Sequence, residues 1–317
     1  MRLPAVRQAW GALLLIPLLV SASPAVSWGF PFRSVNVDSA VLVEMEEGQV
    51  QVLYAKNPEG ERAPASLVKL MTLYLALESV RAGEIRLSDV VFISPNAATA
   101  DRYRMGLRAG ERVTLETLLG GVAIASANDA AVAVAEAVEG SVEAFVARMN
   151  ARAQEIGLVH TRFANPHGLP GGEQYATAAD LALLTLRLLA DYPEAGRFLE
   201  GQRFVHRGRV YERRFSLFQN PGGILVLKTG YTGEAGYNLA VVARKSGKQL
   251  LVVLLGAGTR GGSFSEAARL LNLGFKNGEP EPPRALKSAR RGVRARAAAG
   301  RSIPLPAASL QLTRRPR

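Results

Sequence analysis

The sequence lacks cysteine altogether and has only three histidines among its 317 residues. Without cysteine the chain cannot form disulfides, thiol nucleophiles or cysteine-rich zinc sites, and this absence is compatible with an oxidising compartment. His160, His167 and His206 do not show the short spacings that are typical of metal ligands. We therefore expect neither a metal ion nor a cofactor.

Long apolar runs are also scarce, and the clearest one lies near the N-terminus, at residues 11–20 ("GALLLIPLLV"). Arg2 and Arg7 precede this run and small residues follow it up to Ser27, which is the layout of a secretory signal peptide. A retained membrane anchor is the alternative, but the run is shorter than the ~20 residues that a spanning helix needs. We therefore expect residues 1–27 to be a cleaved signal peptide and the protein to be exported across the inner membrane, to the periplasm or cell envelope.

Net positive charge is small in the body of the chain and concentrated at its C-terminal end. Of the net charge of +12, residues 276–317 contribute +9 through eleven lysines and arginines and two glutamates. With Arg2 and Arg7 set aside, residues 28–275 carry only +1, so we expect no basic face and no nucleic-acid partner. Residues 276–317 are rich in proline and arginine and cannot bury much apolar area. We expect them to form a disordered tail that makes at most weak contact with an anionic envelope surface.

The order of the expected elements indicates the fold class. Hydrophobic alternation and turn residues predict strands early and late in the chain, whereas an Ala/Leu-rich helical pattern fills the middle. Strands are expected at 37–44, 50–55, 203–206, 224–228, 237–244 and 249–255, and helices at 66–81, within 114–190 and at 264–275. If the early and late strands share one sheet, the helical block is inserted beside it, which gives an α+β fold over residues 28–275.

The segment "APASLVKLMT" (63–72) places a lysine in an apolar helical turn. Ser66 and Lys69 are three residues apart, so they lie on one face of a helix that is expected to begin near Ser66. Burial among apolar neighbours lowers the pKa of a lysine, and a neutral amine can act as general base for an adjacent hydroxyl. The alternative is a surface lysine that snorkels along the helix, because this spacing often occurs by chance.

Two further polar motifs follow in the chain. Residues 126–128, "SAN", interrupt a helical pattern that then restarts, although Asn128 could simply cap the next helix. Residues 228–230, "KTG", are expected at the end of a strand, where Gly230 would let a ligand backbone approach closely; a hairpin turn with an exposed lysine is the alternative. In this order, with roughly 60 and 100 residues between them, the three motifs are typical of penicillin-interactive serine enzymes.

About residues 38–275 of the chain resemble the serine-type D-alanyl-D-alanine carboxypeptidase family, the low-molecular-mass penicillin-binding proteins. The resemblance rests on the three motifs and on the segments "FVARMNARAQEIGLVHTRFANPHGL", "YATAADLA" and "KTGYTGEAGYNLA", which follow in the family's order. It implies an antiparallel sheet flanked by helices, an inserted mostly helical subdomain, and a catalytic cleft between the two. It also implies peptidoglycan stem peptides as the substrate and β-lactam antibiotics as inhibitors.

The resemblance implies a catalytic role for several of these residues. Ser66 would be the acylated nucleophile, Lys69 would be its general base, and Ser126 would relay a proton toward the leaving group. The backbone N–H groups of Ser66 and Tyr231 would form the oxyanion hole.

Other residues are implied to bind the substrate. Asn128 would hold a substrate amide, Lys228 would supply positive potential and help the proton relay, and Thr229 would bind the terminal carboxylate. Family members carry an arginine after the last strand that helps to hold this carboxylate, and Ser263 stands at that place here. We expect Arg260, in the Gly-rich loop "GAGTRGGS", to reach the site instead, with a solvated loop arginine as the alternative.

The sequence departs from the family pattern at two further places. Leu225 and Val226 stand where the family usually has Asp-Gly, shortly before the lysine of the third motif. The stretch "RRFSLFQNPGG", which begins at Arg213, stands where the family often has an Asn-rich segment. These departures concern the choice of substrate rather than the type of reaction.

The sequence favours one activity and leaves a second one open. "SAND" (126–129) resembles the carboxypeptidase form of the second motif, which predicts removal of the terminal D-alanine from stem peptides. The 42 residues after Phe275 are too few and too polar for the β-rich second domain of many family carboxypeptidases. The shorter members of the family include endopeptidases that cut D-alanyl cross-links.

Two other classes of protein are disfavoured. A class A β-lactamase needs a glutamate that activates the deacylating water, and the loop "FANPHGLPGGEQ" offers only Glu173, outside the expected pattern. A non-catalytic wall-binding homologue would be expected to lack Ser66 or Lys69, and both are present.

Overall fold

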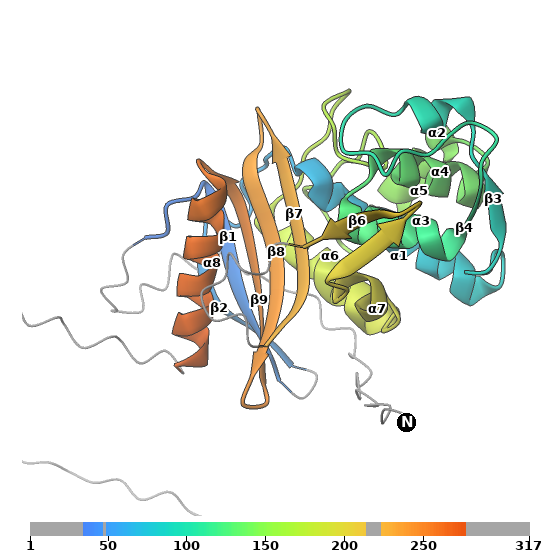
Figure 1. Ribbon diagram of the computed structural model, residues 1–317. Helices are drawn as coiled ribbons and strands as arrows, with labels where there is room; N and C mark the ends of the chain where they lie inside the picture. The colour runs from blue at the N-terminus through green and yellow to red at the C-terminus, as the bar shows by residue number, and fades with distance from the viewer. Residues whose placement is uncertain (1–33, 47–48, 214–222, 277–317) are drawn as a thin grey trace, which may run out of the picture. The chain divides into compact units, whose positions relative to one another are not determined.

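The computed structural model describes residues 34–46, 49–213 and 223–276 (Figure 1). The predicted signal peptide, residues 1–27, and the predicted tail after Lys276 lie outside the described residues. Within the described part of the chain, no helix combines the length and the apolarity that crossing a membrane requires.

The N-terminal and C-terminal strands belong to one antiparallel sheet, so the predicted α+β fold with a split sheet is confirmed. The strand order is β2-β1-β9-β8-β7, which places β1 of the first hairpin directly beside the last strand. In this pairing Ala40 lies opposite Leu254 and Val43 lies opposite Leu251. The strands are β1 (Ser39–Glu46), β2 (Gln49–Lys56), β7 (Ile224–Thr232), β8 (Gly236–Lys245) and β9 (Lys248–Ala257).

Both faces of the central strands of this sheet are covered. Successive side chains of a strand point to opposite faces, so Val41 and Val43 join the core of the helical part. Leu42 instead joins a second core with Phe264 of α8 (Arg260–Phe275). Figure 1 shows α8 on one side of the sheet and the other helices on the opposite side. Burial on both faces explains why β9 reads as the continuous apolar run "LLVVLL".

The middle of the chain forms the inserted helical part, with α1 at its centre. Residues 70–77 of α1 are buried all round the helix, and α1 packs against α4, α5 and α6. The helices are α1 (Lys69–Ala82), α2 (Pro95–Thr99), α3 (Leu115–Gly120), α4 (Asn128–Glu139), α5 (Val142–Glu155), α6 (Ala178–Asp191) and α7 (Ala195–Leu199). A short 3₁₀ turn, η1 (Ala65–Val68), precedes α1, and a π-helical turn, η2 (Gly121–Ala125), precedes α4. Two small antiparallel ribbons accompany the helices: β3 (Val90–Phe92) with β4 (Arg112–Thr114), and β5 (Arg203–His206) with β6 (Arg209–Glu212).

Two segments differ in detail from the sequence prediction. The helix expected from Ser66 starts as the 3₁₀ turn η1 and becomes α-helical at Lys69. The motif at 228–230 lies inside β7 rather than at the end of a strand, because β7 stays paired with β8 as far as Thr232. The third motif therefore belongs to the edge strand of the sheet.

The loop predicted around Arg260 is wrong, because Arg260 is the first residue of α8. Thr259 Oγ1 accepts a hydrogen bond from the backbone N–H of Gly262 at 3.0 Å, which caps the helix. This cap outweighs the low helix propensity of the glycines, and α8 begins four residues before the predicted start at Phe264.

Candidate active site

The candidate nucleophile, Ser66, follows a strained backbone position. Ala65 has a φ of 48°, in the left-handed region that a residue with a side chain adopts at a cost. Gly168 holds it there: a Cβ on Gly168 would lie 1.9 Å from the carbonyl oxygen of Ala65. The turn that carries Ser66 is therefore fixed between α1 and the "ANPHGL" loop, with Ser66 itself partly exposed.

The base candidate, Lys69, is fully buried, so the alternative of a surface lysine is wrong. Its Nζ lies 3.1 Å from Ser66 Oγ, 2.7 Å from Asn128 Oδ1 and 2.6 Å from the carbonyl oxygen of His167. The amide and carbonyl oxygens can only accept hydrogen bonds, whereas the hydroxyl can also donate. When the amine is neutral, its two hydrogens go to these two oxygens and its lone pair is left for the Ser66 hydroxyl.

The surroundings of Lys69 favour this neutral form. Burial is the largest effect and lowers the pKa of Lys69 well below its usual value, and the neighbouring Lys228 lowers it further. Asp129 acts in the opposite direction, but it is buried and its carboxylate accepts hydrogen bonds from the backbone N–H groups of residues 105–107. The site thus holds a lysine that is suited to the predicted role of general base.

Asn128 orients this base. Its Nδ2 donates to the carbonyl oxygens of Asp101 at 2.7 Å and Arg102 at 2.6 Å, so Oδ1 is the atom that faces Lys69. The alternative that Asn128 caps the next helix is wrong, because α4 begins at Asn128 without a side-chain cap. Its contact with a substrate amide stays a prediction.

A second serine–lysine pair lies beside the first. Lys228 is 2% exposed, and its Nζ donates to Ser126 Oγ at 2.8 Å and to the carbonyl oxygen of Thr229 at 3.0 Å. Burial, and secondly the charge of Arg213, lower the pKa of Lys228 to about 7. The alternative of an exposed hairpin lysine is therefore wrong. A lysine that titrates near neutral pH can both hold and release a proton, which suits a relay through Ser126.

The backbone interruption predicted at the second motif explains how Ser126 reaches Lys228. The π-helical turn η2 ends at Ala125, and Ser126 adopts a left-handed φ of 54° before α4 begins. Such π-helical turns are frequent at functional sites because they displace a side chain from the regular helical path.

Strand β7 brings the third motif against the nucleophile turn. A Cβ on Gly230 would lie 2.9 Å from the backbone nitrogen of Ser66, so this position requires glycine. The prediction assigned that space to a ligand backbone, whereas the protein's own backbone fills it. Thr229 is exposed beside it, and Tyr231 is 41% exposed with its ring stacked on Tyr237 at 4.4 Å. The oxyanion hole of Ser66 and Tyr231 stays a prediction, which the contact between β7 and Ser66 supports.

Arg260 is not joined to the three motifs in the part of the chain that the structure describes. It is exposed at the start of α8, and the buried Ser263 donates its hydroxyl to the carbonyl oxygen of Arg260 at 2.8 Å. Strand pairing places this helix start at the same end of the sheet as Tyr231, because Tyr231 pairs with Tyr237 and Tyr237 pairs with Ala257. Contact of Arg260 with a substrate carboxylate stays a prediction.

Three contributors to the site were not found from the sequence. Asp129 could have been identified as a contributor from its position directly after the second motif. Arg213 begins the stretch noted for its departure from the family pattern, but nothing in the sequence connects it with Lys228. The contact between Lys69 and the carbonyl oxygen of His167 cannot be predicted from residue types, because every residue carries a backbone carbonyl.

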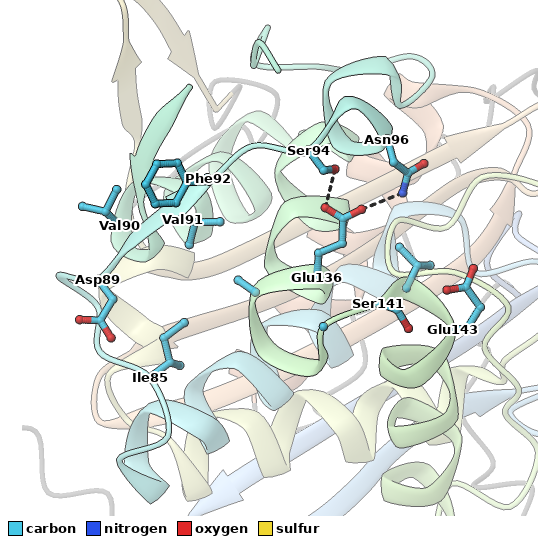
Figure 2. A pocket seen from close by; sticks show the side chains of 13 residues that line it. Ile85, Asp89, Val90, Val91, Phe92, Ser94, Asn96, Glu136, Ser141 and Glu143 are labelled. Carbon is cyan, nitrogen blue, oxygen red and sulfur yellow. Dashed lines mark hydrogen bonds between the residues drawn. The ribbon is translucent and has the colours of Figure 1, made fainter. Parts of the chain in front are cut away.

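A separate hollow of about 550 Å³ contains none of the predicted site residues (Figure 2). It lies between β3 and the junction of α4 with α5. Its central carboxylate, Glu136, accepts hydrogen bonds from Ser94 Oγ at 2.6 Å and Asn96 Nδ2 at 2.8 Å. These bonds connect α2 with α4, so we assign the hollow to packing and the chemistry to the three motifs.

The fold and the two serine–lysine pairs are those expected of penicillin-interactive serine enzymes. The family described as D-alanyl-D-alanine carboxypeptidase matches residues 25–259. The chain belongs to this family.

Individual relatives agree with this assignment. The D-alanyl-D-alanine carboxypeptidase DacF of Bacillus subtilis (strain 168) is 38% identical over 250 residues, which cover 77% of this chain and 63% of the relative. A D-alanyl-D-alanine endopeptidase of Pseudomonas aeruginosa is 28% identical over 264 residues, which cover 81% of this chain and 83% of the relative. The crystal structure of penicillin binding protein 5 from Haemophilus influenzae has a TM-score of 0.73 and 33% identity, covering 77% of this chain and 72% of that chain. The chain thus spans a little under two thirds of the length of the DacF relative.

Proposed function

We propose that the protein is a penicillin-sensitive serine DD-carboxypeptidase, which removes the terminal D-alanine from peptidoglycan stem peptides through an acyl-enzyme on Ser66. The observation that carries this proposal is the geometry around Lys69, whose other two partners leave its lone pair to the Ser66 hydroxyl. Family membership and the likeness to penicillin binding protein 5 support the substrate class and the sensitivity to β-lactams.

In the acylation step, Ser66 Oγ attacks the carbonyl carbon of the penultimate D-alanine while its proton passes to neutral Lys69. The negative charge that develops on the carbonyl oxygen is stabilised by the backbone N–H groups of Ser66 and Tyr231. The close approach of Gly230 to the Ser66 nitrogen supports this arrangement, because it packs the residue before Tyr231 against the nucleophile turn.

The leaving D-alanine needs a proton on its nitrogen. Ser126 donates this proton and takes a replacement from protonated Lys228, to which it is hydrogen-bonded at 2.8 Å. When the C–N bond breaks, free D-alanine departs and the acyl group stays on Ser66. Lys69 then carries one extra proton and Lys228 lacks one, so transfer between them restores both before water hydrolyses the ester.

We expect the third motif to receive the substrate's terminal carboxylate. Thr229 is exposed at the edge of β7, next to the buried Lys228, and offers a hydroxyl donor. Arg260 would add a second cation from the start of α8. In this arrangement the carboxylate is held at one end of the cleft while Ser66 faces the scissile bond.

A second candidate activity is cleavage of D-alanyl cross-links between stem peptides. Two observations favour it. The chain covers 83% of the Pseudomonas aeruginosa endopeptidase, more than the 63% of DacF. Ser263 stands where the family has the carboxylate-binding arginine, and an internal bond presents a different carboxylate arrangement from a free terminus.

We infer that the protein acts in the periplasm or cell envelope, where peptidoglycan is found. The expected signal peptide at residues 1–27 and the family of the chain support this location. The basic segment after Lys276 would add weak attraction to anionic envelope surfaces.

One assay tests the proposed activity and its alternative together. The purified protein is incubated with diacetyl-L-lysyl-D-alanyl-D-alanine and, separately, with a cross-linked muropeptide, and the products are separated by chromatography. Release of D-alanine from the tripeptide, absent in Ser66→Ala, is expected. Cleavage of the muropeptide alone would replace the carboxypeptidase assignment by the endopeptidase one, and no product from either substrate would contradict both.

A further inference from the structure

Arg213, at the end of the β5–β6 ribbon, holds three backbone carbonyls. Its guanidinium donates to the carbonyl oxygens of Ala123 at 2.9 Å, Phe198 at 3.0 Å and Leu199. Phe198 and Leu199 end α7, and Ala123 lies in the π-helical turn η2. A single side chain thereby joins three segments that are far apart in the sequence.

One of these carbonyls belongs to the turn that sets the position of Ser126. Ala123 is three residues before Ser126, and the left-handed φ of Ser126 follows directly from the end of η2. Ser126 Oγ in turn accepts the hydrogen bond from Lys228 Nζ at 2.8 Å. Loss of the hydrogen bond from Arg213 to Ala123 would therefore displace the turn η2, and with it the Ser126 side chain of the second serine–lysine pair.

Arg213 also acts on Lys228 through its charge. A guanidinium stays protonated under ordinary conditions, and none of the ion pairs within residues 34–46, 49–213 and 223–276 neutralises this one. Burial lowers the pKa of Arg213 to about 10, and the charge of Arg213 is the second cause, after burial, of the lowered pKa of Lys228. Lys228 is buried and Arg213 is half-buried, and the dipoles of three backbone carbonyls compensate the charge of Arg213.

We propose that Arg213 is a positioning residue of the acylation machinery, which fixes the turn of Ser126 and acts electrostatically on the proton carried by Lys228. The proposal rests on the proposed function, because it concerns the proton that passes to the nitrogen of the departing D-alanine or of the opened β-lactam ring. A proton donor works best when it releases its proton near the working pH, and a nearby cation brings a lysine into that range.

Other charged groups near the two lysines are fixed or neutral. Lys69 is the lysine of the first serine–lysine pair, and burial keeps its pKa low. The Asp129 carboxylate accepts hydrogen bonds from four backbone N–H groups. His167 lies near Lys69, and burial lowers its pKa to about 4, so it is uncharged around neutral pH. Among these groups, Arg213 is therefore the one whose removal changes the charge around Lys228 without altering a motif residue.

The test compares Arg213→Gln, Arg213→Lys and a matched control, Arg209→Gln. Arg209 is the first residue of β6, four residues before Arg213, and it is exposed, with its guanidinium 4.9 Å from the centre of the Tyr211 ring. The second-order rate of Ser66 acylation by a fluorescent penicillin is measured as a function of pH for the full-length protein. The wild type is measured first, because a wild type that is not acylated contradicts the proposed function itself.

Removal of the positive charge of Arg213 should move the alkaline limb of the acylation rate profile to higher pH. Without Arg213 the protonated form of Lys228 is less disfavoured, so Arg213→Gln should shift this limb by roughly half a unit to one unit and lower the rate at neutral pH by about tenfold. Arg213→Lys keeps a cation but has fewer donors, so its limb should stay in place while its rate falls. Arg209→Gln should match the wild type.

Two outcomes would overturn the proposal. One is an unchanged profile and rate in both Arg213 variants. The other is a loss of rate in Arg213→Gln with no shift of the limb, which is the behaviour of a purely structural contact. If Arg213→Gln does not fold, Arg213→Lys decides, and a wild-type rate in that variant would contradict the positioning role.

Discussion

Lys69 Nζ and Ser66 Oγ are 3.1 Å apart, and the direction of proton transfer between them follows from the other partners of Lys69. Asn128 Oδ1 and the carbonyl oxygen of His167 take the two hydrogens of a neutral amine, so its lone pair meets the serine proton. The pair is therefore arranged for proton removal from Ser66 before any substrate binds.

Replacement of Lys69 by arginine should abolish acylation nearly as completely as Ser66→Ala. A guanidinium cannot be deprotonated in a protein, so it cannot accept the proton of Ser66. The acylation rate with a fluorescent penicillin should fall by roughly 10²–10⁴-fold, the usual contribution of general base catalysis. Lys245→Arg, on the exposed end of β8, is the control and should react like the wild type. Substantial acylation of Lys69→Arg would show that Lys69 is not the base.

Asn128→Asp should move the acid limb of the acylation profile to higher pH. A carboxylate 2.7 Å from the Nζ of Lys69 would favour the charged ammonium and raise the pKa of Lys69. Less of the neutral base is then present at a given pH, and the limb should move up by about one unit or more. Asn272→Asp, on the exposed face of α8, controls for the added negative charge. An unshifted limb in Asn128→Asp would mean that the Asn128 contact does not control the base.

The sequence predicted the sheet and the three motifs, but it did not predict the hydrogen bonds and charges that connect the motif residues. Continuous apolar runs identified the central strands β8 and β9, because both of their faces are buried. The exact position of the third motif within β7 depends on pairing with β8, which a single strand does not reveal. The partners of Lys69 and Lys228 depend on tertiary contacts, including the backbone carbonyl of His167 and the guanidinium of Arg213.

Gly168→Ala should cost both stability and acylation. Gly168 has a φ of +88°, and the added Cβ would meet the backbone of Ala65 at 1.9 Å, next to Ser66. Gly83 is the matched control, because it has a φ of +76° with no atom within 4 Å of an added Cβ.

Chemical denaturation should separate the two effects at these glycines. Gly83→Ala should lower the free energy of unfolding by about 1–2 kcal/mol, the cost of the left-handed conformation. Gly168→Ala should lose a further 1–3 kcal/mol, roughly, because the packed backbone must move, and it should also be acylated more slowly. Equal losses in the two variants would show that the nucleophile turn tolerates the added atom.

Removal of the basic segment should leave the chemistry unchanged. The described fold ends with α8, and none of the three motifs lies after Lys276. A chain that ends at Asn277 should react with penicillin at the wild-type rate and should lose salt-sensitive binding to anionic lipid vesicles. The rates and a vesicle sedimentation assay at low and high salt measure the two properties. A slower reaction would mean that the segment contributes to the active-site body.

We predict that Arg260, at the start of α8, meets the substrate carboxylate. Arg260 is exposed there, at the same end of the sheet as Tyr231, and its backbone is fixed by the Thr259 cap. The long side chain therefore extends from a rigid helix terminus, although the sequence predicted a flexible loop. Ser263 is turned inward and bonded to the Arg260 carbonyl, so it does not replace the family's arginine.

Arg260→Ala should therefore discriminate between substrates by their C-terminal charge. A charge-assisted hydrogen bond contributes about 1.5–3 kcal/mol, which corresponds to a loss of roughly one to two decades in kcat/KM for peptides with a free carboxylate. Peptides with an amidated C-terminus lack that charge and should be affected much less, and Arg86→Ala, on an exposed arginine of the helical part, should change neither. An equal loss on both kinds of peptide, or no loss, would contradict the contact. Thr229 and Lys228 would then hold the carboxylate alone, and the serine at position 263 would favour an internal, cross-linked substrate.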